Sequence, residues 1–309
     1  MLDLKIMNKN YRCPRKYLFK YLGLDSLEKI LSNATIKFAP PKSFNDPFDM
    51  QHRFDATFSK ERAREIYREA FTEMYQSNEC VPFNSINPKA SLAALIQLLR
   101  NELSLPDFLK QVEPAIEKSV DGFFSAGEEL TSFWDSEIDN YRVFCMSEIN
   151  DDTKMWAHYA DKNSGAVIKL EMLTELDRGL TVARKCVYQD NPLVVYTEQD
   201  FKELIKSNPD LDVEKLYDSL LYTKDIKWSD EKEWRVVIPV YKNENFDFYS
   251  LHKDELSEIY FGYRVSDEII DKFIELSIKH FPGLKFFKAY KSLELKKIQF
   301  NEYLIKKSI

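Results

Sequence analysis

Short apolar runs of strand type alternate with amphipathic helical stretches along most of this 309-residue chain. β-Branched and aromatic residues fill the short runs, whereas the longer stretches repeat apolar residues at helical spacing. A chain that changes between these two periods has to pack helices against a sheet. No internal repeat interrupts the pattern. We therefore expect an α+β fold with a mixed sheet, whose strands lie at residues 17–22, 35–41, 141–149, 165–172, 231–240, 258–263 and 284–292.

Residues 81–137 differ from their surroundings because they contain helical patterns and no strand signal. Pro88 and Pro106 each suit the first position of a helix, where a missing N–H group does no harm. Helices are also expected at residues 59–76 and 199–221 and after Ser266, a residue type that caps helices. The prediction is a single domain over residues 1–309 with a helical insertion at 81–137.

Composition and charge remove several classes of protein. Hydrophobic residues make up 44% of the chain and aromatic residues 14%, enough for a substantial core. The net charge of −7 gives no overall basic field of the kind that nucleic-acid binders carry. No run reaches the roughly 18 apolar residues that a membrane span needs, and the N-terminus lacks the apolar core of a signal peptide. We expect a cytoplasmic protein with no membrane partner.

Sequence motifs exclude the standard catalytic sites. Glycine occurs only seven times, and neither a GxGxxG nor a GxxxxGK loop is present to hold phosphates. The four histidines are scattered without an HExxH pair, and no GxSxG turn occurs. The four cysteines are far apart, which favours reduced thiols. No metal cofactor is expected, and the chemistry has to rely on carboxylates, single polar residues and aromatics.

Two acidic residues lead into one of the most apolar strands. Glu231 and Glu233 open the run EKEWRVVIPV, and a carboxylate entering a low-dielectric interior is costly unless something satisfies it. In a continuous strand Glu231, Glu233 and Arg235 would share one face. The two glutamates would then line a cleft, with Arg235 able to pair with one of them or with a phosphate.

Four stretches place polar groups in an apolar context, and together they resemble a known family. They are FKYLGLDSLEKIL, KFAPPKSFNDPFD, FCMSEINDDTKMWAHYADKNSGAVIKL and WSDEKEWRVVI. An opening tyrosine strand, an FNDPF box, MWxHYA with a later glycine, and an E-x-E-[WY]-R strand mark the bacterial domain of unknown function 2971. The resemblance covers residues 17–300 apart from the helical insertion. Cys145-Met146-Ser147 stands where that family usually has CFS.

The layout of that family looks like the ADP-ribosyltransferase fold, which implies NAD as a substrate. In that fold a first strand carries His or Arg beside Tyr, and a later strand supplies a catalytic glutamate. These positions fall on Lys20, Tyr21 and Glu233, with Glu231 two residues earlier. Lys20 departs from the pattern, because the first position is normally His or Arg. This step is an analogy between folds.

The implied chemistry assigns a role to each candidate residue. Cleavage of the nicotinamide–ribose bond develops an oxocarbenium-like centre, which a fixed carboxylate stabilises. Glu233 is expected to bind the ribose, and Glu231 to orient or deprotonate the acceptor. The acceptor would be a protein or a nucleic acid, as for a toxin or antiphage effector, or water if NAD is hydrolysed. The remaining candidates for NAD contacts are Tyr21 and Tyr159 by stacking, and Lys20, Asn45, Asp46, His158 and Arg235 by polar contacts.

Each of these features has a structural alternative. The two glutamates would form an exposed strand end if they paired with Lys227 or Arg235. Asn45 and Asp46 precede a proline and suit a turn. His158 and Tyr21 are equally compatible with hydrogen-bonded structural positions. Two other functions therefore remain: a non-catalytic ligand-sensing or protein-interaction module that uses the same cleft, and a metal-dependent nuclease built on Asp46, Glu231 and Glu233.

Overall fold

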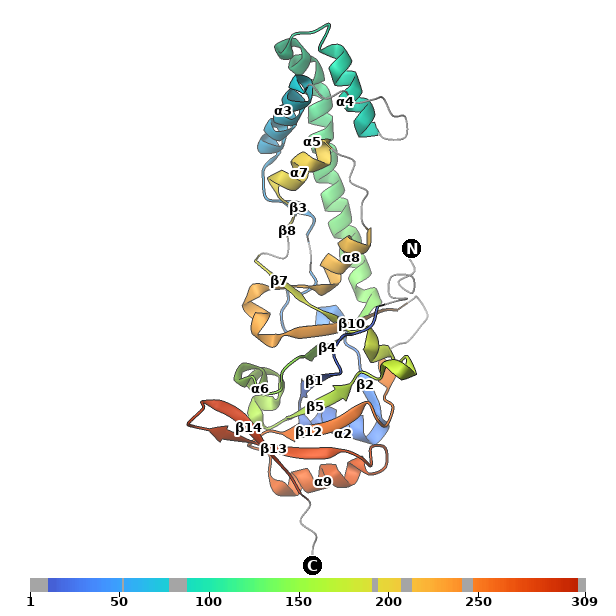
Figure 1. The fold of residues 1–309 in the computed structure, drawn as a ribbon, viewed down its shortest axis with the longest axis vertical. Helices are drawn as coiled ribbons and strands as arrows, with labels where there is room; N and C mark the ends of the chain where they lie inside the picture. The colour runs from blue at the N-terminus through green and yellow to red at the C-terminus, as the bar shows by residue number, and fades with distance from the viewer. Residues whose placement is uncertain are drawn as a thin grey trace, which may run out of the picture. The chain divides into compact units, whose positions relative to one another are not determined.

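The computed structural model describes residues 11–51, 53–77, 88–190, 194–206, 213–240 and 247–304 (Figure 1). The chain divides into two compact units. The sheet unit comprises Met1–Pro47, Ile138–Asp190 and Leu221–Ile309, and the helical unit comprises Phe48–Glu137 and Asn191–Leu220. A large mixed sheet accompanied by helices confirms the predicted α+β class.

The sheet unit is built on eight strands in the order β14-β13-β12-β5-β1-β4-β10-β6. Neighbouring strands are antiparallel except for the parallel pair β12 and β13. A parallel pair needs a crossover connection, and the helix α9 (Asp267–Ser277) provides it, capped by the Ser266 hydroxyl as predicted. The strands are β1 (Tyr17–Leu22), β4 (Tyr141–Ser147), β5 (Ala166–Glu171), β6 (Arg184–Lys185), β10 (Glu233–Pro239), β12 (Leu256–Phe261), β13 (Lys285–Ser292) and β14 (Lys297–Glu302).

Shorter elements surround this sheet. Two small ladders pair β2 with β11 and β7 with β9. The expected strand at residues 35–41 is shorter than predicted, because a 3₁₀ turn begins at Pro41. The elements are α2 (Leu24–Asn33), β2 (Thr35–Lys37), η1 (Pro41–Ser43), η2 (Ile138–Asn140), α6 (Thr153–Tyr159), η3 (Asp161–Asn163), η4 (Thr174–Leu176), η5 (Gly179–Val182), β7 (Val187–Gln189), β9 (Thr223–Asp225), η6 (Ile226–Glu231) and β11 (Phe248–Ser250).

Helices cover both faces of the large sheet. On one face Leu18 and Ile168 belong to a core that includes Leu27 of α2 and Phe273 of α9. On the other face Phe19, Tyr21 and Val167 pack with Trp156 and Ala160 at the helix α6. Strands that are buried on both faces read as nearly continuous apolar runs, and Val236, Val237 and Ile238 of β10 form such a run. A charged residue in such a strand therefore needs a partner inside the protein.

The helical unit packs its helices around an aromatic core. Phe58, Phe71, Phe108 and Phe201 are buried there together with Ile66. This unit contains residues 88–137 of the predicted insertion, and also residues 48–77 and 194–206. Residues 81–87, at the start of the predicted insertion, lie outside the described residues. The single-domain organisation stays a prediction. The elements are β3 (Asp55–Ala56), α3 (Lys60–Gln76), α4 (Pro88–Leu99), α5 (Leu105–Glu137), β8 (Val194–Tyr196), α7 (Glu198–Lys206) and α8 (Val213–Tyr222), of which Leu221 and Tyr222 belong to the sheet unit.

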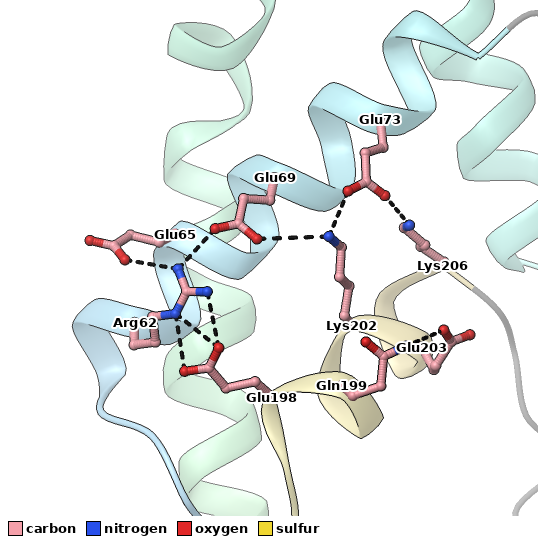
Figure 2. A network of polar contacts seen from close by, with 9 residues as sticks. All are labelled: Arg62, Glu65, Glu69, Glu73, Glu198, Gln199, Lys202, Glu203 and Lys206. Atoms are coloured by element: carbon pink, nitrogen blue, oxygen red, sulfur yellow. Dashed lines mark hydrogen bonds and ion pairs between the residues drawn. The ribbon is translucent and has the colours of Figure 1, made fainter.

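A ladder of ion pairs joins α3 to α7 within the helical unit (Figure 2). Arg62 contacts Glu65, Glu69 and Glu198, while Lys202 bridges Glu69 and Glu73. Hydrogen bonds from Lys202 and Lys206 lower the pKa of Glu73. These side chains are largely exposed, so each pair stabilises weakly and is screened by salt. Figure 2 shows that the pairs follow one another along the two helices.

Two glycines of α5 allow a matched test of this packing. A Cβ atom at Gly122 would meet nothing within 4 Å, whereas one at Gly127 would lie 2.6 Å from the carbonyl oxygen of Phe54. We expect Gly122→Ala to raise the free energy of unfolding by about 0.5–1 kcal/mol, because alanine restricts the unfolded chain. Gly127→Ala should lower it. Urea denaturation of the two variants checks this, and equal shifts of the same sign would contradict the placement of α5.

Candidate functional site

Five side chains form a buried charge cluster at the N-terminal end of β10. The ammonium group of Lys224, on β9, lies 2.6 Å from Glu231 Oε2 and 2.5 Å from Glu233 Oε2. Arg235 Nε lies 2.6 Å from the other oxygen of Glu233. The hydroxyl of Tyr159, at the end of α6, donates to Glu231 Oε1 at 2.7 Å. We call these five residues the charge cluster.

The charged members are almost completely removed from solvent. Arg235 is 0% exposed, Glu233 4%, and Lys224 and Glu231 7% each. Two carboxylates and two cations balance in charge, which is the condition under which ionised groups tolerate burial. Removing one member would leave its partner charged and unpaired in a dry environment. The two glutamates are therefore tolerated in the core because a lysine and an arginine meet them there.

The backbone places Glu231 differently from the prediction. Glu231 ends the 3₁₀ segment η6, and Lys232 follows in the left-handed region with φ 46°. The prediction that Glu231 shares a continuous strand face with Glu233 and Arg235 is therefore wrong, because β10 begins only at Glu233. The two carboxylates nevertheless meet, since the turn at Lys232 brings both of them to Lys224.

Hydrogen bonds from neighbouring segments fix this turn. The hydroxyl of Ser147, on β4, donates to the carbonyl oxygen of Glu231 at 2.7 Å. The amide of Glu233 donates to the Tyr188 hydroxyl at 2.7 Å, and the amide of Cys186 donates to the Glu233 carbonyl. The backbone around both glutamates is therefore held by β4, β6 and β7, so the carboxylates are positioned before any ligand arrives.

The two glutamates differ in acidity. Burial alone would raise the pKa of Glu233, but Arg235 and Lys224 outweigh it and hold this pKa well below its usual range. For Glu231 burial dominates and raises the pKa above the ordinary value, although Lys224 and the Tyr159 hydroxyl offset part of the shift. Glu233 is thus a fixed negative charge, whereas Glu231 is the carboxylate that exchanges a proton more readily. Pairs with separated pKa values are typical of acid–base sites.

The FNDPF box is fastened to the segment that carries the cluster. Trp228 Nε1 donates to Asp46 Oδ2 at 2.5 Å, and Lys227 Nζ lies 3.6 Å from the same oxygen. The guanidinium carbon of Arg235 lies 5.8 Å from the centroid of the Phe44 ring. Asp46 and Phe44 therefore anchor this turn on η6 and β10, while Asn45 between them is exposed.

The remaining predicted site residues occupy mixed positions. Phe19 of β1 and Glu233 of β10 both pair with Ser147, so Tyr21 lies on the sheet face of Glu233. Lys20 lies on the opposite face, where its ammonium group donates to the Cys145 carbonyl at 2.8 Å. The charge cluster thus contains Tyr159, Glu231, Glu233 and Arg235 of the predicted set, and not Lys20.

Tyr21 and His158 have different surroundings from the cluster residues. Tyr21 is buried edge-to-face against Trp156, and its hydroxyl donates to the Ile149 carbonyl at 3.1 Å. His158 is exposed on α6, with its ring centroid 6.3 Å from that of Tyr159. Tyr21 therefore supports α6 through its contact with Trp156, whereas His158 is open to solvent.

A strained turn holds the end of α6 that carries Tyr159. Asp161, Lys162 and Asn163 all have positive φ, between 46° and 70°. A Cβ atom at Gly165 would lie 2.4 Å from the Leu22 carbonyl oxygen, and one at Gly262 would lie 2.2 Å from the Asn163 carbonyl oxygen. The turn therefore rests directly on backbone at the ends of β1 and β12, which explains the glycine after MWAHYA.

Sequence reasoning missed Lys224, the residue on which both carboxylates converge. It lies in TKDIKW, between a helix and the WSDEKEW stretch, and no periodicity distinguishes it from the nearby Lys227. Trp228 and Tyr188 were missed for the same reason. The one available signal was that two buried carboxylates need a cation beside them, which predicts a basic partner without identifying Lys224.

All five members of the charge cluster lie in the segment that matches a family model. Residues 155–236 match the family described as protein of unknown function, DUF2971. The match supports the family that the motifs suggested. No curated protein and no solved structure matches this chain. The likeness to the ADP-ribosyltransferase fold and the bacterial origin stay predictions.

In the part of the chain that the structure describes, no three His, Cys, Asp or Glu side chains gather where they could hold a metal ion. None of its helices has the length and apolar character required to cross a membrane. Asp46, Glu231 and Glu233 do not form such a group, and Asp46 contacts Trp228 and Lys227.

The cost in stability of a glutamine substitution should separate the two glutamates. Glu233→Gln leaves Arg235 and Lys224 buried beside a neutral group, so we expect it to lower the free energy of unfolding by about 3 kcal/mol or more. Glu231→Gln should cost much less at neutral pH. Because the pKa of Glu231 is raised on folding, its stabilising contribution is present at low pH and lost as the pH rises through that pKa. Urea denaturation at several pH values measures both effects, and equal costs would refute the assignment.

Proposed function

We propose that the charge cluster is the active site of an enzyme that cleaves the nicotinamide–ribose bond of NAD and transfers ADP-ribose to a macromolecule. The observation that carries this proposal is the pair of carboxylates of unequal acidity that meet on one lysine beside a tyrosine hydroxyl. A fixed carboxylate next to a developing oxocarbenium ion lowers the barrier because it binds the transition state more strongly than the ground state. The same residues lie in the segment that matches the family model.

The contacts favour different roles for Glu231 and Glu233 from those that the sequence predicted. Lys224 and Arg235 occupy both oxygens of Glu233, so Glu233 serves to hold Lys224 in place. Glu231 accepts from a neutral hydroxyl on Tyr159, a bond that a ribose hydroxyl of NAD can replace. Glu231 is then the carboxylate that contacts the substrate. Tyr159 releases Glu231 and packs beside the nicotinamide end, and the exposed His158 and Asn45 contribute polar contacts.

A second function is favoured by one specific observation. Glu233 is fully engaged by two cations and almost completely buried, as in many structural ion-pair networks. A site of this kind suits a module that binds a ligand at Tyr159 and Glu231 without transforming it. Such a module would be stabilised by its ligand and would release no nicotinamide.

Nicotinamide release from NAD, alone and with cell lysate, is the experiment that separates these functions. The enzyme should release nicotinamide, and Glu231→Gln should reduce the rate by roughly 10²-fold or more, the scale of one lost preorganised group. Glu233→Gln is a poor test, since its effect on folding confounds its effect on turnover. Melting temperature is recorded on the same preparations.

The chain offers a matched control for that substitution. Glu258 also accepts from a tyrosine hydroxyl, that of Tyr260, and lies 3.0 Å from the ammonium group of Lys169. Glu258→Gln repeats the chemistry of Glu231→Gln at another place and should leave nicotinamide release unchanged. A stable, fully active Glu231→Gln would remove the cluster from the mechanism. Absence of release with a raised melting temperature in NAD would favour the ligand-sensing module.

A further inference from the structure

The indole ring of Trp228 lies beside the charge cluster and attracts two ammonium groups. Trp228 belongs to η6, which ends at Glu231, and the residue is half-buried. The ammonium nitrogen of Lys224 lies 5.4 Å from the ring centroid, and that of Lys227 lies 6.0 Å from it. Among aromatic side chains, indole binds cations most strongly through its π face. Trp228 is therefore a cation-binding surface next to the two carboxylates.

The two lysines on this ring are held with different strength. Lys224 is 7% exposed and is fixed by both glutamates of the charge cluster. The Lys227 side chain is 52% exposed, and its ammonium group lies 3.6 Å from Asp46 and 3.3 Å from Asp225. Exposed ion pairs of this kind stabilise weakly. Lys227 can therefore leave the ring while it keeps Asp225 as a partner, and a cation from solution can take its place.

The charges around the ring favour such a cation. Asp46 accepts from Trp228 Nε1 at 2.5 Å, which fixes the orientation of the ring and places a negative charge at its edge. Lys224 contacts both the ring and Glu231, so the ring and this carboxylate lie on two sides of one ammonium group. A ligand with a positive charge over Trp228 and a hydroxyl group beside it can thus engage the ring and Glu231 together.

We infer that Trp228 binds the positively charged nicotinamide ring of NAD, which takes the place of the Lys227 ammonium group. This inference rests on the proposed function and names a binding residue for its substrate. A flat pyridinium ring combines charge with a stacking surface, so it fits an indole face better than an ammonium group does. When the bond to the ribose breaks, its electron pair stays with the ring nitrogen. The ring then leaves as neutral nicotinamide, which Trp228 holds less strongly.

Two small molecules of nearly the same shape separate charge from fit. 1-Methylnicotinamide is a pyridinium cation, whereas nicotinamide is neutral. Calorimetric titration of the full-length chain should show the cation binding roughly tenfold more tightly, the scale of a cation–π contact at a partly desolvated ring. Equal binding of the two would overturn the inference. Equally tight binding of methylguanidinium would also overturn it, because the ring would then accept a basic side chain as readily as a pyridinium.

Variants of the ring and of its exposed lysine test the assignment to Trp228. Trp228→Leu should abolish the preference for the cation, whereas Trp228→Phe should keep part of it, because a π face remains without the hydrogen bond to Asp46. Lys227→Gln should tighten binding of 1-methylnicotinamide, because a competing ammonium group is removed. Lys154→Gln, at an exposed lysine that pairs with Asp230, is the matched control and should change nothing. A preference that survives in Trp228→Leu, or weaker binding in Lys227→Gln, would overturn the inference.

NAD itself keeps this inference apart from the proposed function. NAD should raise the melting temperature more than NADH, whose reduced ring is neutral, and Trp228→Leu should remove that difference. Nicotinamide release is measured on the same preparations. A chain that prefers NAD through Trp228 but releases no nicotinamide supports the inference and contradicts the enzyme. Release without any preference for the cationic ring keeps the enzyme and overturns the role of Trp228.

Discussion

The contact of Glu233 with Lys224 and Arg235 is the interaction on which the site depends. Arg235 is fully buried on β10, and β10 lies between β4 and β6 in the large sheet. A cation at that depth is tolerable only beside a carboxylate, and a single carboxylate would still leave Lys224 in excess. Glu231 supplies the second negative charge. The acidity of both glutamates depends on this balance, because Lys224 lowers the pKa of each carboxyl group.

The segments around the cluster serve to keep it in place. The FNDPF box is anchored by Asp46 on Trp228, and the turn after α6 lies on glycines at the ends of two strands. Tyr159 reaches Glu231 only because both of these supports fix their segments. The family motifs therefore describe one arrangement, in which distant stretches of the chain hold two carboxylates of different acidity. That arrangement is the physical basis of the chemistry proposed at Glu231.

Much of the sheet unit could be predicted from the sequence, whereas the site could be predicted only in part. β1, β13 and α9 lie where the periodicity placed them, because apolar patterns specify which face is buried. Glu231 was misplaced because a single left-handed residue, Lys232, breaks the alternation, and a lysine at such a position carries no sequence signal. Lys224 was missed because its importance comes from contacts across the fold. Lys20 was assigned to the site by analogy between folds. The strand register instead places it on the sheet face opposite Glu233, where it donates to the Cys145 carbonyl.

A double-mutant cycle between Lys224 and Glu233 tests the central claim most directly. Lys224→Met and Glu233→Gln are measured singly and together by urea denaturation at neutral pH. If the buried charges balance one another, each single change leaves a partner uncompensated. The double variant should then be more stable than the sum of the single effects by about 1.5–3 kcal/mol. Additive effects within about 0.5 kcal/mol would show that the two charges do not depend on each other and would contradict the account.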